Sequence, residues 1–125
     1  MTSFFTSVYC KGFINGLSKE LFSLTHAMCD KNQYESMGNL VLMVLQVRYG
    51  KLMSVVIGKQ IEEGFHVFSF EVTSDCRLLD YGTRAMDYLK SEYSKIRLHS
   101  LHESQVFYEK MGFCPTGESE FTWRS

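Results

Sequence analysis

The stretch VTSDCRLLDYGTRAMDYL, residues 72–89, decides how the fold is interpreted. It has the pattern of a strand end, a tight loop and the first turns of a helix. That arrangement commonly receives phosphate groups on free backbone amides at a helix N-terminus. Asp80 nevertheless places a carboxylate where an anion would lie. The stretch therefore predicts either a phosphate-bearing ligand at this loop or an aspartate that takes the place of the phosphate.

Strand patterns precede this stretch. Residues 40–47, 52–58 and 65–72 are apolar or alternating runs separated by glycine turns, which predicts a three-stranded meander. The alternation in the third run predicts that His66, Phe70 and Val72 share one face and that Glu71 lies on the other. Further upstream, the sequence predicts a strand, an amphipathic helix and a polar connector, at residues 3–10, 13–29 and 30–39.

The sequence downstream predicts a helix at residues 82–93 and a strand at residues 95–101. Ser100 and Glu103 form an S-x-x-E capping box, which predicts a short helix that runs through Met111 and ends at Gly112. The tail predicts a C-terminal hairpin without a full last strand. That strand would be absent or supplied by a neighbour, so we expect an exposed edge and a homodimer as one assembly.

Composition sets limits on the class of protein. The 125 residues are enough for a single domain, residues 1–125, with one hydrophobic core. Thirteen Lys and Arg residues balance fourteen Asp and Glu residues without a basic run, so no nucleic-acid partner is expected. No apolar run is long enough to span a membrane, and no signal peptide is recognisable, which favours a cytosolic protein without membrane contact.

Four cysteines are widely spaced and lack a C-x-x-C motif, so neither a metal site nor a redox motif is indicated: Cys10, Cys29, Cys76 and Cys114. Buried thiols in a reducing compartment are the simpler interpretation.

The order of elements and two motifs resemble the GCN5-related N-acetyltransferases, the GNAT family. In that family a hydrophobic-x-Val strand end precedes a loop of the form R/Q-x-x-G-x-G/A. Residues 70–72 match the strand end, and RLLDYG at residues 77–82 matches the loop with one departure. SQVFYEKMGF at residues 104–113 matches the family's later a-x-x-F-Y-x-k-x-G-F motif. The resemblance covers about residues 40–114 and implies an α+β GNAT fold, a mostly antiparallel twisted sheet of six to seven strands flanked by helices.

The resemblance also implies acetyl-CoA as cosubstrate. The pyrophosphate would bind the loop amides, and the pantetheine arm would run along the fourth strand and bond the backbone at Val72. The implied cofactor-binding residues are Phe70, Val72, Arg77, Leu79, Asp80, Tyr81, Gly82, Thr83, Ser104 and Phe107.

Asp80 is the departure, because it replaces the first glycine of the loop motif. An aspartate adds bulk and negative charge where glycine permits close approach. Asp is also a favoured helix N-cap, a role that needs no ligand. Arg77 and Arg84 could offset the repulsion, so we expect CoA binding to be retained but weakened.

Two residues are candidates for the chemistry. Tyr108 matches the tyrosine that protonates the leaving thiolate of CoA in many family members; the alternative is a packed core tyrosine. His66 is the candidate base that deprotonates the amine, with a suitable ordinary pKa near 6.5; the alternative is a structural histidine. Glu71 is a weaker candidate. His99 and His102 follow the fifth strand, and nothing in their spacing requires a role.

The expected function is therefore acetyl transfer from acetyl-CoA to a primary amine of a small molecule or protein, by direct attack in a ternary complex. The alternative is a non-catalytic GNAT-fold binding or regulatory module with a weakened CoA site. The sequence does not identify the acceptor amine.

Overall fold

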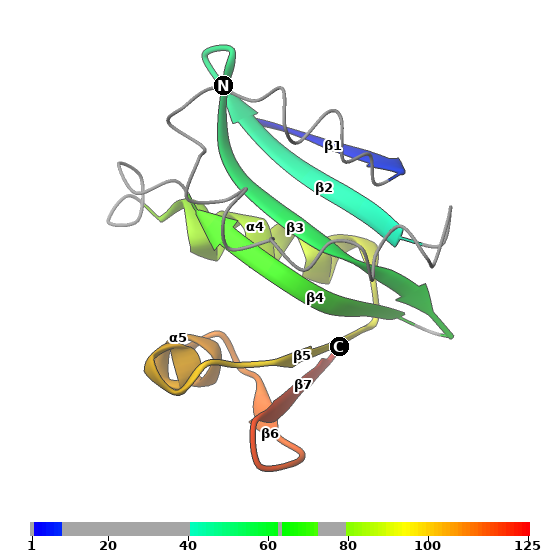
Figure 1. Ribbon diagram of the computed structural model, residues 1–125, viewed down its shortest axis with the longest axis vertical. Helices are drawn as coiled ribbons and strands as arrows, with labels where there is room; N and C mark the ends of the chain where they lie inside the picture. Colours follow the sequence, from blue (N-terminus) through cyan, green and yellow to red (C-terminus); the bar gives the residue numbers. More distant parts are fainter. Residues whose placement is uncertain (1, 9–40, 63, 73–79) are drawn as a thin grey trace.

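The computed structural model describes residues 2–8, 41–62, 64–72 and 80–125. These residues form a seven-stranded sheet with the strand order β1-β2-β3-β4-β5-β7-β6 (Figure 1). The strands are β1 (Thr2–Val8), β2 (Val41–Arg48), β3 (Lys51–Ile61), β4 (Gly64–Val72), β5 (Lys95–His99), β6 (Cys114–Pro115) and β7 (Glu120–Arg124). The helices are α4 (Tyr81–Glu92), α5 (Gln105–Lys110) and the short 3-10 helix η4 (His102–Ser104).

The predicted α+β fold with a mostly antiparallel sheet is confirmed. Neighbouring strands are antiparallel except for β4 and β5, which are parallel. The helix expected at residues 13–29 and the connector after it lie outside the described residues. The expectation of a missing last strand is wrong, because β7 is present and lies between β5 and β6, where it pairs with both.

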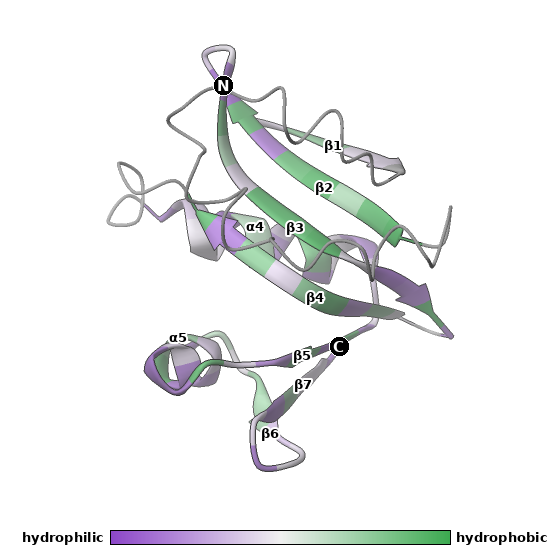
Figure 2. Cartoon of the chain, viewed as in Figure 1, coloured by the Kyte–Doolittle hydropathy of each residue, from purple (hydrophilic) through white to green (hydrophobic). Residues whose placement is uncertain are grey.

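Apolar side chains form clusters on both faces of the sheet. The larger cluster lies on the face that α4 and α5 cover, where Met86 and Leu89 of α4 and Tyr108 of α5 pack against Phe65 and Val67 of β4. The smaller cluster lies on the other face of β2 and β3 and includes Val41, Met43, Leu45, Val55 and Ile57. Because both faces of β2 and β3 carry buried side chains, most of β2 and the middle of β3 are hydrophobic, whereas the end of β3 is hydrophilic (Figure 2).

A β-bulge in β4 changes which side chains face the helices. Ile57 of β3 is opposite Ser69, whereas the next residue, Gly58, is opposite Val67, so Phe68 is the extra residue. Val67 and Phe70 both face the helix-covered cluster, and Phe68 packs against the other one. The prediction that His66 shares a face with Phe70 and Val72 is therefore wrong, because strict alternation does not hold across a bulge.

The end of α5 is fixed by a left-handed residue. Gly112 has a φ of 89°, its N–H bonds the Glu109 carbonyl at 3.0 Å, and the Phe113 N–H bonds the Tyr108 carbonyl at 3.0 Å. This is the Schellman arrangement, and it confirms the predicted helix end. The capping box is not formed, because the Ser100 hydroxyl donates instead to the Leu101 carbonyl at 2.7 Å.

The two parallel strands separate soon after they pair. β4 and β5 are paired only at Phe65–Ile96, His66–Arg97 and Val67–Leu98. Beyond these pairs the C-terminal half of β4 diverges from β5, and the sheet opens (Figure 1). Within the described part of the chain, no helix is long and apolar enough to cross a membrane.

Candidate active site

A cleft lies where β4 and β5 diverge. It has two adjoining hollows of about 390 Å³ and 300 Å³, and Phe70, Glu71, Leu101, Ser104 and Tyr108 line both. Val72, Gly82, Glu103 and Phe107 complete the first hollow. Residues from β4, α4 and the η4–α5 segment therefore meet in one cleft, among them five of the residues that the resemblance assigns to CoA: Phe70, Val72, Gly82, Ser104 and Phe107.

Helix α4 begins beside this cleft at a strained residue. Asp80 is the N-cap and has a φ of 63° and a ψ of 7°, the left-handed conformation that glycine adopts without cost. Its side chain makes no capping hydrogen bond, so the expected capping role is not realised. Its carbonyl accepts the first helical hydrogen bond, from the Arg84 N–H at 2.9 Å. The backbone therefore has the shape that a glycine would favour.

The first turn of α4 supplies the features that an anion requires. The amides of residues 81–83 precede the first helical bond donor, Arg84, so helix geometry leaves them without a partner inside the helix. The buried Tyr81 accepts a hydrogen bond on its hydroxyl from Arg48 at 3.1 Å. Thr83 is half-buried in the same turn. Arg77 and Leu79 lie outside the described residues.

Gly82 leaves room at the floor of the cleft. A Cβ atom added there would lie 3.5 Å from the Phe107 ring and 3.7 Å from a Val72 methyl carbon, which are ordinary contact distances. A side chain at this position would thus fit without strain but would occupy space beside two cleft residues. Glycine therefore serves the width of the cleft rather than the backbone of the helix.

Tyr108 lies between the core and the cleft. It is 8 % exposed and its ring packs against Phe107, Phe113 and Phe121, yet it lines both hollows. Burial, and to a smaller extent the nearby Glu71 carboxylate, raises the pKa of Tyr108 to about 12. The hydroxyl therefore keeps its proton throughout the neutral range and can donate a hydrogen bond to an atom that gains negative charge.

Glu71 has a larger part in the cleft than the sequence indicates. It lines both hollows with Tyr108. The predicted alternation separates Glu71 from His66, but the bulge at Phe68 places both on the same side of β4. A bulge has little local sequence signal, and the close packing of Gly58 against Phe65 and His66 is visible only in the structure.

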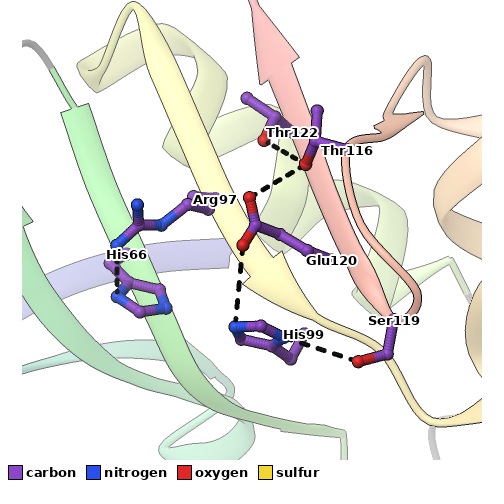
Figure 3. A network of polar contacts seen from close by, with 7 residues as sticks. All are labelled: His66, Arg97, His99, Thr116, Ser119, Glu120 and Thr122. Carbon is purple, nitrogen blue, oxygen red and sulfur yellow. Dashed lines mark hydrogen bonds and ion pairs between the residues drawn. The ribbon is translucent and has the colours of Figure 1, made fainter.

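His66 lies beside the cleft rather than in it, since it lines neither hollow. Its Nδ1 is 3.3 Å from a terminal nitrogen of Arg97, which can only donate, so the neutral ring accepts at Nδ1 and carries its proton on Nε2 (Figure 3). Burial and then the charge of Arg97 lower the pKa of His66. A lone pair already used by Arg97 makes His66 a poorer base than its position in the sequence indicates.

His99 lies near both His66 and the cleft, and it belongs to a separate set of polar contacts. The His66 and His99 ring centres are 6.1 Å apart, and His99 lines the second hollow. His99 Nε2 is 3.9 Å from a Glu120 carboxylate oxygen, and Glu120 accepts a hydrogen bond from the Thr116 hydroxyl at 2.9 Å (Figure 3). His102 is exposed and lines neither hollow.

No model of a protein family matches the sequence, and no curated protein matches it. Solved structures match over nearly the whole chain. The Bacillus subtilis N-acetyltransferase YlbP, solved with coenzyme A, is 16 % identical, with 100 % of this chain and 97 % of YlbP covered and a TM-score of 0.67. A GNAT-family acetyltransferase from Staphylococcus aureus Mu50 is 12 % identical, with 98 % and 99 % covered and a TM-score of 0.67.

Aminoglycoside 6'-acetyltransferase type Ii is 21 % identical, with 96 % of each chain covered and a TM-score of 0.66. The chain therefore has the fold of the GNAT acetyltransferases. This is the architecture that the two sequence motifs predict.

Proposed function

We propose that the protein is an acetyl-CoA-dependent N-acetyltransferase that acts on a primary amine by direct attack in a ternary complex. The observation that carries this proposal is the cleft between β4 and β5, where Tyr108 and Glu71 adjoin Val72 and Gly82 at the start of α4. A similar fold solved with coenzyme A supports it.

The described residues fit acetyl-CoA. The amides of residues 81–83 suit an anionic pyrophosphate at the positive end of α4. The hollow beside Gly82 and Phe107 suits the extended pantetheine arm. The amide groups of that arm would hydrogen-bond the edge of β4 beyond its last pair with β5. Asp80 opposes the anion, and this is why we expect weaker binding than a glycine would give.

In the proposed reaction the amine nitrogen attacks the thioester carbonyl carbon, the C–S bond breaks, and CoA leaves as a thiolate while the nitrogen loses a proton. Tyr108 donates a hydrogen bond to the sulfur as negative charge develops there. Full proton transfer from Tyr108 is uphill, since its pKa is about 12 and that of a thiol is about 8.5. Tyr108 thus acts mainly by stabilising the leaving sulfur.

The proton acceptor for the amine must reach the same cleft. Glu71 is our preferred base because its carboxylate lines both hollows together with Tyr108. His66 remains an alternative that acts through His99 or a water molecule. Glu71→Gln and His66→Gln distinguish these two candidate bases. The variant that lacks the true base should lose most rate at the acidic end of the pH-rate profile, where little of the amine is unprotonated.

The second candidate function is a binding or regulatory module, and the carboxylate of Asp80 at the helix N-terminus favours it. Two measurements distinguish the enzyme from the binding module. Titration calorimetry measures acetyl-CoA binding, and mass spectrometry detects acetylation of primary amines incubated with the protein and acetyl-CoA. Binding with acetyl transfer supports the enzyme. Binding without transfer to any amine supports the module. No binding at millimolar acetyl-CoA contradicts both the enzyme and a module that binds CoA.

A further inference from the structure

A separate hollow lies on the sheet face opposite α4 and α5. Its volume is about 450 Å³, and strands β5, β7 and β6 form most of its walls. On β5 and β7, buried residues such as Ile96, Leu98 and Phe121 belong to the helix-covered face, and the residues between them face the hollow. Its lining residues are Lys95, Arg97, Gly112, Cys114, Thr116, Glu120, Thr122 and Arg124.

The hollow carries an excess of positive charge. Lys95 lies directly opposite Arg124 in the pairing of β5 and β7, and Arg97 is two residues further along β5. Like charges directly opposite one another destabilise a sheet. Among the described residues no carboxylate lies within ion-pair distance of Lys95 or Arg124, and the single carboxylate of the lining, Glu120, contacts His99 and Thr116. The cations therefore have no neutralising partner in the described chain.

Hydrogen-bond donors surround the same space. The hydroxyls of Thr116 and Thr122 lie 3.1 Å apart within the lining. Arg97 directs one terminal nitrogen to His66, and its buried Nε has no hydrogen-bond partner in the part of the chain that the structure describes (Figure 3). The Thr116 hydroxyl already donates to Glu120, so the cations are the main attraction of the hollow. Cations without an ion-pair partner among the described residues match the chemistry of an oxyanion, which offers acceptor oxygens and a negative charge.

The hollow adjoins the cleft through the contact between His99 and Glu120. His99 lines the cleft, Glu120 lines the hollow, and the two side chains touch at 3.9 Å. A strand rises about 3.3 Å per residue, so Arg97 is about 7 Å and Lys95 about 13 Å from His99 along β5. One small molecule can therefore span both places.

We propose that this hollow binds the oxyanion group, a carboxylate or a phosphate, of the acceptor amine, so that the substrate class is an amine whose acidic group is at least about 7 Å away, the distance along β5 from His99 at the cleft to Arg97 in the hollow. This inference rests on the proposed function. An α-amino acid is too short to bridge the two places, whereas a longer ω-amino acid or an aminoalkyl phosphate has the required length.

Anion binding is measured first, without any acetyl transfer. NMR amide shifts of β5 and β7 are followed while inorganic phosphate or acetate is added to the wild type, Lys95→Gln, Arg124→Gln and the control Lys51→Gln, an exposed lysine on β3. Each variant of the hollow should bind about two- to fivefold more weakly, and the control should match the wild type. Equal binding by all four proteins, or no saturable shift in the wild type, overturns the site.

Acceptor choice is measured second, with 6-aminohexanoate, 6-aminohexanamide and 6-aminohexyl phosphate. The acids should show a lower KM than the amide, and Arg124→Gln should raise the KM of the acids alone while kcat stays the same. The better of the two acids identifies carboxylate or phosphate. Anion binding without any preference for acids overturns the acceptor role. Anion binding without acetylation of any amine refutes the proposed enzyme and leaves only an anion site.

Discussion

The two halves of β4 differ in what lies beside them. Residues 65–67 pair with β3 on one side and β5 on the other, whereas residues 69–72 pair with β3, have left the β5 ladder, and border the cleft. The bulge at Phe68 separates the halves and reverses which side chains face the helices. One strand can thus contribute a part paired on both sides and a part that borders a cleft, with an extra residue that changes its register between them.

Tyr108→Phe should produce the largest effect, because it removes the hydroxyl that faces the open half and keeps the packed ring. We expect acetyl transfer to slow by roughly ten- to a thousandfold. Acetyl-CoA affinity should change little, and circular dichroism should show an unchanged fold. Steady-state kinetics and calorimetry provide the measurements, and wild-type turnover by this variant would rule out the assigned role.

Gly58→Ala should disrupt the bulge that separates the two halves of β4. An added Cβ would lie 2.2 Å from the His66 carbonyl oxygen and 2.4 Å from the Phe65 ring, so the backbone at the bulge must move. We expect a loss of about 2–3 kcal/mol in the free energy of unfolding, as for overpacked cores. Urea denaturation measures this loss.

Gly82→Ala is the matched control for that substitution, since its Cβ would meet neighbours only at 3.5 Å or more. It should leave stability equal or slightly higher, because alanine is the better helix former, while it narrows the cleft and weakens acetyl-CoA binding. Equal destabilisation by the two substitutions would contradict the account of the bulge.

Asp80→Gly should stabilise the protein and strengthen acetyl-CoA binding beside the C-terminal half of β4. Glycine relieves the left-handed strain at a φ of 63°, so we expect stability to rise by about 1 kcal/mol and Tm by a few degrees. Acetyl-CoA should bind more tightly because the negative charge is gone. Asp80→Asn separates the causes, since it removes the charge but not the strain; unchanged affinity in both variants would show that Asp80 does not obstruct the ligand.

His66→Gln should produce the smallest effect, and it concerns the paired half. The pKa of His66 is lowered in the folded protein, so the unfolded chain binds the proton more tightly and stability falls as the pH drops from about 6.5 through the lowered pKa. The variant should lose this part of the pH dependence in thermal melts between about pH 7 and pH 5. An identical slope in the wild type and the variant would mean that another group is responsible.

Much of the fold follows from the sequence because periodicity and glycine positions are local signals. The runs that became β2, β3, β4 and β5 are apolar or alternating, and the glycine at residue 112 marks the end of α5 where a left-handed residue is needed. The two motifs likewise indicate which loop and which helix meet, since Gly82 and Phe107 do border one cleft.

The errors arose where tertiary contacts override local patterns. Alternation predicts the wrong face for His66 because a bulge reverses it. The S-x-x-E pattern predicts a cap at Ser100, but the Ser100 amide donates to the Ser119 carbonyl at 2.8 Å, in the loop before β7. The contact of Arg97 with His66 depends on the parallel register of β5 beside β4, and the contact of His99 with Glu120 depends on the antiparallel register of β5 beside β7. No spacing within one segment encodes either register.

The narrow join between β4 and β5 divides the described part of the sheet into two units. Among the described residues, three pairs of the β4–β5 ladder connect the β1–β4 unit to the β5–β7–β6 unit, and α4 and the helix-covered apolar cluster pack across both units. Amide hydrogen exchange should therefore show a sub-global opening in which β5, β6 and β7 lose protection together while β2 and β3 remain protected. A ligand inserted between the diverging strands would join both units, so protection of β5 should increase more than that of β2 when the cleft is filled.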